Sequence, residues 1–583
     1  MADLRVDLTE SYFSNQLLEK ISDFTSGTEF SRDQIVEITA LLHNEKSIDI
    51  IKSYQLLRND TQPRRNFFSL LDVMIELLPK IEYPTVDVME FVIHLAQEAG
   101  RDGMRFQFIE AFRRFCVKDV SRASDGIKYL IEFPEKFVDL LCPLIISGSE
   151  NQLEEFLNIA IQLSSHDKFE IRKAATFSLG RIQYRENQRL LDLTLIRLEV
   201  IASREAEDSL RAQALDSGVE ISLNNSDSLD RLLGIAESIL RTGGVMSLHV
   251  ASTKLRIHRE KLSKEMLGVL FRHLVRVDIA NKGTIENIDF GISALLQQDP
   301  ISFYVVEFLE NLILSHNGEL PLASLEMTSH QILASGHTFM AKLFTRWLSR
   351  GDFSLCHNLE PLLNIVHGES IHLGIEQSEL LSIAPVDLLF IARKAVGYLL
   401  TRPITLASII ISIMKIADDL DLIVDLADLL YDPLLLNFPG TVTKYIASIA
   451  VAESGQTKEA LDGCLAKAEI YYAQLKEMGE LPELHPSQRH REAYSRYWGE
   501  RMAISSKDVR KESVFANLFT TQTLLYGRGA INYIQHGSGQ SHRMEIPLKP
   551  ISVSIEIPRR TQIDQFGFKF TMAQYRAERK IQS

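Results

Sequence analysis

Five aspartates follow one another at steps of three and four residues between residues 418 and 432. Such steps place side chains on one face of an α-helix, so the spacing predicts a row of five carboxylates on a helix whose other sides are Leu, Ile and Val. The four like-charged neighbouring pairs would destabilise that helix by roughly 1–2 kcal/mol in total. This acidic stripe consists of Asp418, Asp421, Asp425, Asp428 and Asp432.

The acidic stripe has three interpretations. Its members could form a solvated outer face, which is the usual place for charged side chains. They could instead bind a basic partner or the basic tail of the same chain. A hard metal ion is disfavoured, because one straight helix cannot surround an ion with six to eight oxygen ligands.

Arginines alternate with aromatic residues between residues 489 and 501. This basic-aromatic segment consists of Arg489, Arg491, Tyr494, Arg496, Tyr497, Trp498 and Arg501. Further positive charge follows at Lys507, Arg510, Lys511, Arg559, Arg560, Arg576, Arg579 and Lys580. Rings beside guanidinium groups are typical of proteins that bind single-stranded nucleic acid or another acidic partner. The alternative is a packing face in which the aromatic side chains seal the end of a helical stack.

Enzyme signatures are missing from the sequence. It contains no GxxxxGK[ST] phosphate loop, HExxH, GxSxG or EF-hand pattern. His536, Ser538 and His542 lie in a glycine-rich stretch that is typical of a loop, whereas a catalytic site needs a fixed group to orient its base. These two histidines, with His485 and His490, match no zinc spacing. We therefore expect no catalytic residue, metal ion or cofactor.

The cysteines and the apolar segments predict a cytoplasmic protein. The four cysteines lie far apart without a CxxC pair, which fits a reducing compartment: Cys116, Cys142, Cys356 and Cys464. The first residues do not resemble a secretion signal. The longest apolar run, Ile404–Met414, is too short for a bilayer that needs about 20 residues, so we expect no membrane attachment.

Helical periodicity extends from about residue 10 to residue 478. One clear example places apolar residues at steps of three and four: Val88, Phe91, Val92, Leu95 and Ala99. Residues 385–400 and 403–414 are apolar nearly all round, which predicts central helices covered on several sides. At 583 residues the chain is too long for one core, so several domains or an elongated stack are expected.

Some of the predicted helices resemble one another at a nearly fixed distance. The segment 171–182 aligns with 210–221, and both have Arg in second place and Ala in fifth. Further copies start at Leu248 and Ile288, so the successive steps are 39, 38 and 40 residues. A period of this size indicates a repeat architecture in which each unit covers the apolar face of the next.

The first copy carries a succession of residues that resembles the HEAT and armadillo class of helical repeats: Asp167, Arg172, Ala174, Ala175, Leu179 and Gly180. This resemblance implies an α-solenoid, in which small residues let neighbouring hairpins approach closely. Residues 447–472 resemble one tetratricopeptide-type hairpin, with Gly455 at the bend and Ala460, Cys464 and Ala468 facing inward. The resemblance implies an architecture and no particular activity.

The chain changes character after Pro482 and Pro486. Residues 485–583 contain 16 Lys and Arg against 8 Asp and Glu, whereas residues 1–484 contain 47 against 69. The net charges of the two parts are therefore +8 and −22. Residues 551–557 and 566–572 alternate apolar and polar side chains, which predicts a β-hairpin, and residues 527–543 are predicted to be a loop.

These observations predict a mainly α protein: a HEAT/armadillo-like α-solenoid with a small basic C-terminal α+β segment that contains a β-hairpin. The predicted parts are an N-terminal helical region (1–148), the solenoid with its tetratricopeptide-like end (149–480), and the basic region (485–583). We expect a non-catalytic scaffold or adaptor that docks proteins on its acidic surface. A prokaryotic stress or antiviral defence assembly is compatible with this design. The alternative is a nucleic-acid-binding regulatory subunit that uses the basic region.

Overall fold

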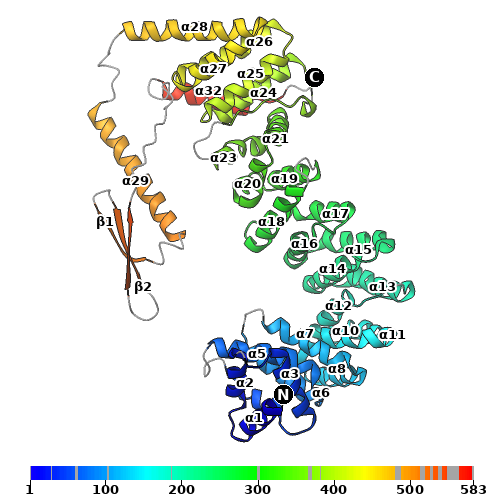
Figure 1. Cartoon of the computed structure of the whole chain (residues 1–583). Coiled ribbons are helices and arrows are strands. Elements are labelled where there is room, and N and C mark those ends of the chain that lie inside the picture. Colours follow the sequence, from blue (N-terminus) through cyan, green and yellow to red (C-terminus); the bar gives the residue numbers. More distant parts are fainter. Residues whose placement is uncertain are drawn as a thin grey trace. The chain divides into compact units, whose positions relative to one another are not determined.

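The structure is a computed structural model, and the chain in it is mainly α-helical (Figure 1). It describes residues 2–580 except 28, 59–63, 101–103, 185–186, 299–302, 366–370, 381, 479–486, 513–518, 526–528, 536–540 and 548–563. The chain divides into two compact units, Met1–Ser335 and Gly336–Ser583. The predicted boundary after residue 148 falls inside a helix, α10 (Leu141–Asn151).

The first unit consists of helices joined by short connections. Its α-helices are α1 (Ala2–Phe13), α2 (Leu17–Ser26), α3 (Arg32–Asn44), α4 (Ile50–Tyr54), α5 (Arg64–Leu77), α6 (Thr85–Glu98), α7 (Met104–Val117), α8 (Val120–Glu132), α9 (Pro134–Phe137), α10, α11 (Leu153–Leu163), α12 (Phe169–Leu179), α13 (Gln188–Arg204), α14 (Asp208–Ser222), α15 (Leu229–Thr242), α16 (Val245–His258), α17 (Lys264–Leu274), α18 (Lys282–Gln298), α19 (Phe303–Ser315) and α20 (Glu326–Ala334). Short 3-10 turns are η1 (Leu78–Lys80), η2 (Val138–Leu140), η3 (Ser226–Ser228) and η4 (Leu322–Ser324).

From α10 onward, the helices of the first unit pack in two rows. The even-numbered helices α10 to α20 each contact the next even-numbered helix, and the odd-numbered helices α11 to α19 do the same. Many neighbouring helices along the chain, such as α10 and α11 or α14 and α15, also pack against each other and so join the rows (Figure 1). Each helix hairpin therefore buries its apolar side against the following hairpin, which is how repeat proteins build a continuous core.

The sequence repeat coincides with one of these rows. The four aligned segments lie in α12, α14, α16 and α18, and their first residues are all buried: Ile171, Leu210, Leu248 and Ile288. Gly180, which ends α12, lies so close to Ser217 of α14 that an added Cβ would be 2.5 Å from the α-carbon of Ser217. The prediction that small residues permit close approach between successive repeats is confirmed at this point.

The second unit is also mainly helical. Its elements are α21 (His337–Arg350), α22 (Phe353–Cys356), α23 (Leu359–Asn364), η5 (Gln377–Glu379), α24 (Pro385–Leu399), α25 (Pro403–Ile416), α26 (Leu420–Leu429), the π-helical segment η6 (Leu430–Leu435), α27 (Thr441–Ala452), α28 (Gly455–Glu477), α29 (Gln488–Glu512), β1 (Phe519–Leu525), β2 (Gly529–Gln535), β3 (Ser541–Pro547) and α32 (Gln565–Ala577).

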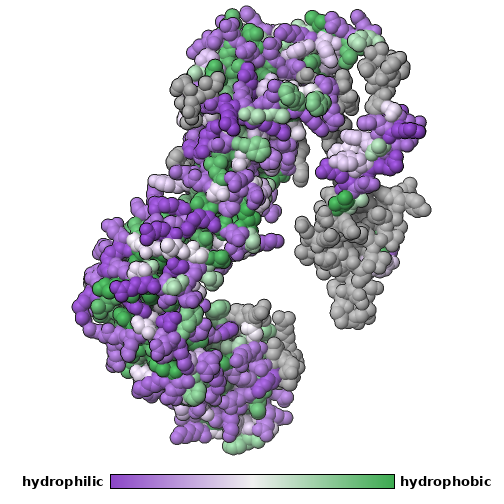
Figure 2. Space-filling model, turned by 180° about the vertical axis from the view of Figure 1, so that it is seen from behind, coloured by the Kyte–Doolittle hydropathy of each residue, from purple (hydrophilic) through white to green (hydrophobic). Residues whose placement is uncertain are grey.

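Helices α24 and α25 form the centre of this unit, as their all-round apolar sequences predict. In α25 nearly every residue from Thr405 to Met414 is buried, and α24 packs against α21, α23, α25, α26 and α32. Among the residues that the structure describes, none of the helices combines the length and the apolar character needed to cross a membrane. On the face drawn in Figure 2, hydrophilic residues predominate and apolar patches are scattered among them.

The hairpin predicted near residues 447–472 is confirmed. Helices α27 and α28 pack against each other, and Gly455 between them has a φ of +67°, a left-handed conformation that favours glycine. Cys464 and Ala468 are buried as expected, and Ala460 is half-buried.

The C-terminal region differs from its prediction in two places. Residues 527–543, predicted as a loop, contribute β2 and part of β3 to an antiparallel sheet of order β1-β2-β3. Residues 566–572, predicted as a strand, lie in α32. The predicted partner strand 551–557 lies outside the described residues. The strand prediction for 566–572 was wrong because Phe568 and Met572, which alternate with polar residues, are also four residues apart and form the buried face of a helix.

Candidate functional site

The acidic stripe is shorter than its spacing predicts. Asp421, Asp425 and Asp428 lie exposed on α26, next to the exposed apolar residues Leu420 and Val424. The Asp428 carboxylate pairs with the Lys467 ammonium of α28 at 3.0 Å. The surface of α26 therefore combines negative charge with exposed apolar side chains.

The two outer aspartates of the stripe do not lie on α26. Asp418 precedes the helix, and Asp419 caps it by accepting a hydrogen bond from the Asp421 amide at 3.0 Å. Asp432 is half-buried in η6 with non-helical backbone angles. The helix cannot continue through this point because Pro433 has no amide hydrogen and its ring restricts the residue before it. The prediction of five aspartates on one face was therefore wrong for Asp418 and Asp432.

The basic-aromatic segment lies in α29, and its side chains are exposed. Tyr494, Tyr497 and Trp498 of α29 are 59%, 51% and 46% exposed. The Trp498 ring contacts both tyrosine rings edge to face, and the Arg501 guanidinium lies 5.5 Å from the centre of the Tyr497 ring. Arg489, Arg491 and Arg496 are exposed on the same helix. Within the described part of the chain, these aromatic side chains do not form the buried packing face that was the alternative.

The remaining basic residues fall into separate places. Three of them, Lys507, Arg510 and Lys511, lie in α29. Arg559 and Arg560 lie outside the described residues. Arg576, at the end of α32, and Lys580, three residues after that helix, contact α24, and Arg579 is exposed between them. Of these basic residues, the structure therefore places Arg576 and Lys580 against α24.

The residues that could support catalysis or metal binding form no such centre in the described part of the chain. His490 is exposed on α29 and His542 lies in β3, while His485, His536 and Ser538 lie outside the described residues. No described group of three or more His, Cys, Asp or Glu side chains could hold a metal ion. The four cysteines have free thiols, and burial raises the pKa of three of them, Cys116, Cys356 and Cys464, to about 12.

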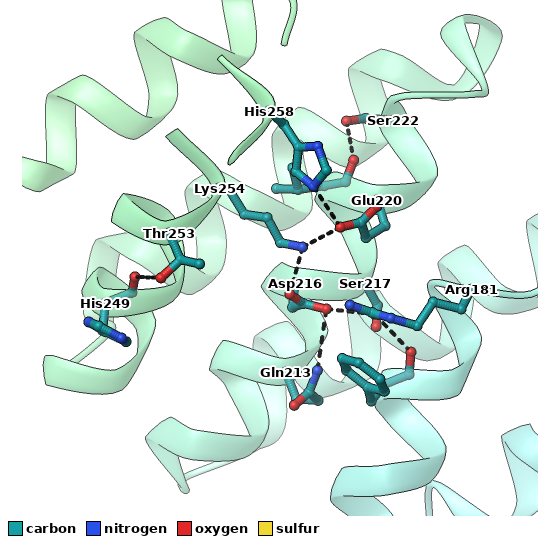
Figure 3. Close-up of polar contacts among 12 residues, drawn as sticks. Arg181, Gln213, Asp216, Ser217, Glu220, Ser222, His249, Thr253, Lys254 and His258 are labelled. Atoms are coloured by element: carbon teal, nitrogen blue, oxygen red, sulfur yellow. Dashed lines mark hydrogen bonds and ion pairs between the residues drawn. The ribbon is translucent and has the colours of Figure 1, made fainter. Parts of the chain in front are cut away.

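A cluster of charged residues that the apolar and small-residue patterns do not reveal joins α14 and α16 of the even-numbered row to the turn that follows α12 (Figure 3). The Lys254 ammonium of α16 lies 2.6 Å from an Asp216 oxygen and 2.5 Å from a Glu220 oxygen, both of α14. His258 contacts Glu220 at 2.9 Å, and Arg181, which follows α12, contacts Asp216 at 2.7 Å. We call these five residues the charge cluster.

The charge cluster is largely withdrawn from solvent, because Lys254 is only 3% exposed. Burial alone would raise the pKa of Glu220, but the hydrogen bond and positive charge of Lys254, together with the charges of His258 and Arg181, lower it. Buried charges require such pairing, since an unpaired charge loses its hydration without compensation. The cluster therefore links successive repeats with charges that satisfy one another.

The charges of the sequence repeat follow a pattern that predicts this cluster. Asp216 and Lys254 occupy the same position in their aligned segments, as do Arg181, Glu220 and His258 at a second position. Charges of opposite sign thus recur one period apart. Stacked repeats bring equivalent positions close together, so complementary residues at one repeat distance predict ion pairs.

The second residue of each aligned segment is polar and also binds an adjoining loop or helix terminus. Arg172 donates to the carbonyls of His166 and Asp167 at 3.1 Å, and Arg211 donates to Thr242 at 2.7 Å. The His249 ring lies 3.0 Å from the Thr284 hydroxyl in the first turn of α18. In the fourth copy, Asp289 accepts from the amides of Met327 and Thr328 in the first turn of α20, at 3.0 and 2.7 Å. A polar side chain at one repeat position therefore fixes an adjoining loop or helix terminus in all four copies.

Asp208 makes a similar link from α14 to α16. It accepts hydrogen bonds from the amides of Gly244, Met246 and Ser247 and from the Ser247 hydroxyl, at 2.6–3.3 Å. Burial would raise the pKa of Asp208, but these hydrogen bonds lower it. A carboxylate at the exposed amides of a helix N-terminus is stabilising because it satisfies donors that have no partner within the helix.

Comparison with known proteins adds no functional assignment. No family model matches the chain, and no curated protein sequence is significantly similar to it.

Proposed function

We propose that this protein is a non-catalytic scaffold or adaptor with a HEAT/armadillo-like repeat architecture and a tetratricopeptide-like hairpin at α27 and α28. The observation that supports the proposal is the two-row stacking of α10 to α20, in which successive repeats are joined by the charge cluster and by the Asp208 and Asp289 links. Such stacks present extended surfaces for binding other proteins. A role in a prokaryotic stress or antiviral assembly stays a prediction.

In this proposal, the surface of α26 is one docking site. Asp421 and Asp425 supply negative charge, while Leu420 and Val424 supply exposed apolar area on the same helix. Charge complementarity steers association and apolar contact holds the bound pose, so a partner with a basic amphipathic helix fits this surface.

Charge reversal on α26 tests this docking site. The variant Asp421→Lys, Asp425→Lys, Asp428→Lys should recover at least about tenfold less of its specific protein partners from native extracts, because like charge replaces the complementary charge. Quantitative mass spectrometry of the co-purified proteins measures the recovery. The matched control, Glu459→Lys, Asp462→Lys, Glu469→Lys, makes the same charge change at exposed positions of α28 and should keep the partners. Equal recovery in all three proteins would show that α26 is only a solvated face.

A second candidate function is single-stranded nucleic acid binding by α29. The exposure of three aromatic rings beside arginines favours it, because bases stack on such rings and arginines neutralise phosphates. Partner docking on α26 and nucleic acid binding on α29 use different surfaces, so the two functions are compatible.

The test of this second function is a salt titration with a fluorescent single-stranded oligonucleotide. Affinity should fall steeply with salt, and Trp498→Ala should weaken binding about tenfold to a hundredfold through loss of stacking. Trp498→Phe keeps an aromatic ring and should bind nearly as well as the wild type. Similar affinities for the alanine and phenylalanine variants would contradict stacking. Point substitutions are needed, because deletion of residues 485–583 would also remove α32 from α24.

A further inference from the structure

The C-terminal helix α32 packs on α24, although almost 170 residues separate them in the chain (Figure 1). Its attachment is concentrated at its C-terminal end. The Arg576 guanidinium donates to the Gly397 carbonyl at 2.6 Å, Glu578 pairs with Arg393 at 3.1 Å, and Lys580 pairs with Asp387 at 3.0 Å. As the chain proceeds from Arg576 to Lys580, its partners proceed backward along α24, so this end runs antiparallel to α24.

Gly397 makes this close approach possible. A Cβ at this position would lie 3.2 Å from the Arg576 amide nitrogen and 3.3 Å from the Tyr575 Cβ. Glycine is disfavoured inside a helix, and Gly397 lies near the end of α24 in an otherwise strongly apolar sequence. The glycine is therefore explained by the contact with α32.

Lys394 recognises the end of α32. Its ammonium donates to the Arg576 carbonyl at 2.7 Å, one of the last carbonyl groups of the helix, whose negative dipole end favours a cation. With α32 in place, Lys394 is buried, and burial lowers its pKa. The charge is therefore stabilised by the carbonyl end of α32 when that helix is bound.

The apolar part of the attachment is narrow. In α32 the buried side chains are Phe568 and Met572, whereas Phe566 and Phe570 are exposed. A cavity of about 620 Å³ opens beside this face and is lined by Phe353 of α22 together with residues of α32. Much of the remaining attachment consists of ion pairs and hydrogen bonds near the end of α32, which a change of a single charge can weaken.

We infer that α32 is a reversible intrachain ligand, and that the face of α24 around Lys394 and Gly397 is a binding site for a helix with this basic C-terminal end. The occupant of the site is residues 565–580 of the same chain. When α32 is bound, the segment from α28 to α32, which includes α29 and the sheet, is held at both ends. When α32 leaves, that segment is held at one end and the α24 face becomes accessible.

Amide hydrogen exchange of the full-length protein tests the reversibility. In the wild type, the α32 amides should exchange through local opening, faster than those of α24 and α25. Lys580→Glu places a like charge beside Asp387 and should accelerate exchange in α32 at least about tenfold, with α24 and α25 remaining protected. The double variant Asp387→Lys, Lys580→Glu restores the pair and should return the rate toward the wild type. Arg579→Glu makes the same charge change at the adjacent exposed residue and should have little effect.

A labelled synthetic peptide of residues 564–583 tests the binding site. The tethered α32 competes at high effective concentration, so the peptide should bind the full-length Lys580→Glu protein at least about tenfold more tightly than the wild type. Gly397→Leu should release α32 and also abolish peptide binding, because the new side chain occupies the site.

Two results would overturn the inference. One is equal exchange of α32 and α24 in every variant, which would make α32 a permanent part of the core. The other is failure of the peptide to bind the Lys580→Glu protein although its α32 exchanges rapidly.

Discussion

Replacing Lys254 with methionine should lower the free energy of unfolding of the first unit by about 3–5 kcal/mol. The ammonium of Lys254 lies within 2.6 Å of both Asp216 and Glu220, and the side chain is almost completely buried. Methionine preserves much of the apolar stem but leaves the two carboxylates, four residues apart on α14, with less positive charge. Removal of one partner from a buried ion pair is far more destabilising than replacement of the whole set.

Urea unfolding followed by circular dichroism measures this effect. Both tryptophans, Trp347 and Trp498, belong to the second unit, so tryptophan fluorescence would not report on the first. The triple variant Lys254→Met, Asp216→Asn, Glu220→Gln removes all three charges and should recover most of the lost stability. Lys264→Met changes an exposed lysine of α17 and should alter stability little. A Lys254→Met protein as stable as this control would show that the charge cluster does not hold the repeats together.

The architecture could be predicted because the repeat leaves a local signal at every period. Small and apolar residues recur in the four aligned segments, and the structure places them in one row of packed helices. The charge cluster also follows this period, because residues one repeat apart in the sequence carry charges of opposite sign. That signal lies in the charges at equivalent positions of the repeat, and the pattern of apolar and small residues does not contain it.

The end of the acidic stripe could also have been predicted from local sequence. Pro433 directly follows Asp432, and a proline both lacks the amide for a helical hydrogen bond and disfavours helix in the preceding residue. The spacing of the aspartates predicts a continuous helix, but Pro433 prevents the helical conformation at Asp432. Asp432 is accordingly half-buried in a non-helical conformation.

The packing of α32 on α24 could not have been predicted from local sequence. The period-two alternation from Phe566 to Met572 also contains the four-residue spacing of Phe568 and Met572, so both a strand and a helix agree with it. Tertiary packing decides between them. That packing depends on Gly397, Lys394 and Asp387, which lie far away in the sequence.

Replacing Gly180 with alanine should destabilise the first unit by about 3 kcal/mol, because the repeats cannot separate locally to admit a methyl group. The backbone of Gly180 has a φ of −73°, which alanine adopts without strain. If the space beside Gly180 were open, alanine would therefore be neutral or would stabilise the protein by about 0.4–1 kcal/mol. The added Cβ, however, would lie 2.5 Å from the α-carbon of Ser217 in the next repeat, and a backbone atom cannot rotate away.

Two other glycines in this unit test the argument by contrast. At Gly148 an added Cβ would overlap the Phe156 ring, so Gly148→Ala should also be destabilising, but Phe156→Leu in the same protein should relieve much of the clash. Adding Ser217→Gly to the Gly180→Ala protein removes the serine side chain, but the backbone of residue 217 still occupies the space that the new methyl group needs. The double variant should therefore recover little of the lost stability. Gly234→Ala in α15 meets nothing within 4 Å and should raise stability by about 1 kcal/mol. Thermal and urea unfolding of these variants would separate backbone crowding between repeats from ordinary overpacking, and equal stability of the Gly180 and Gly234 variants would contradict a close approach of α12 to α14.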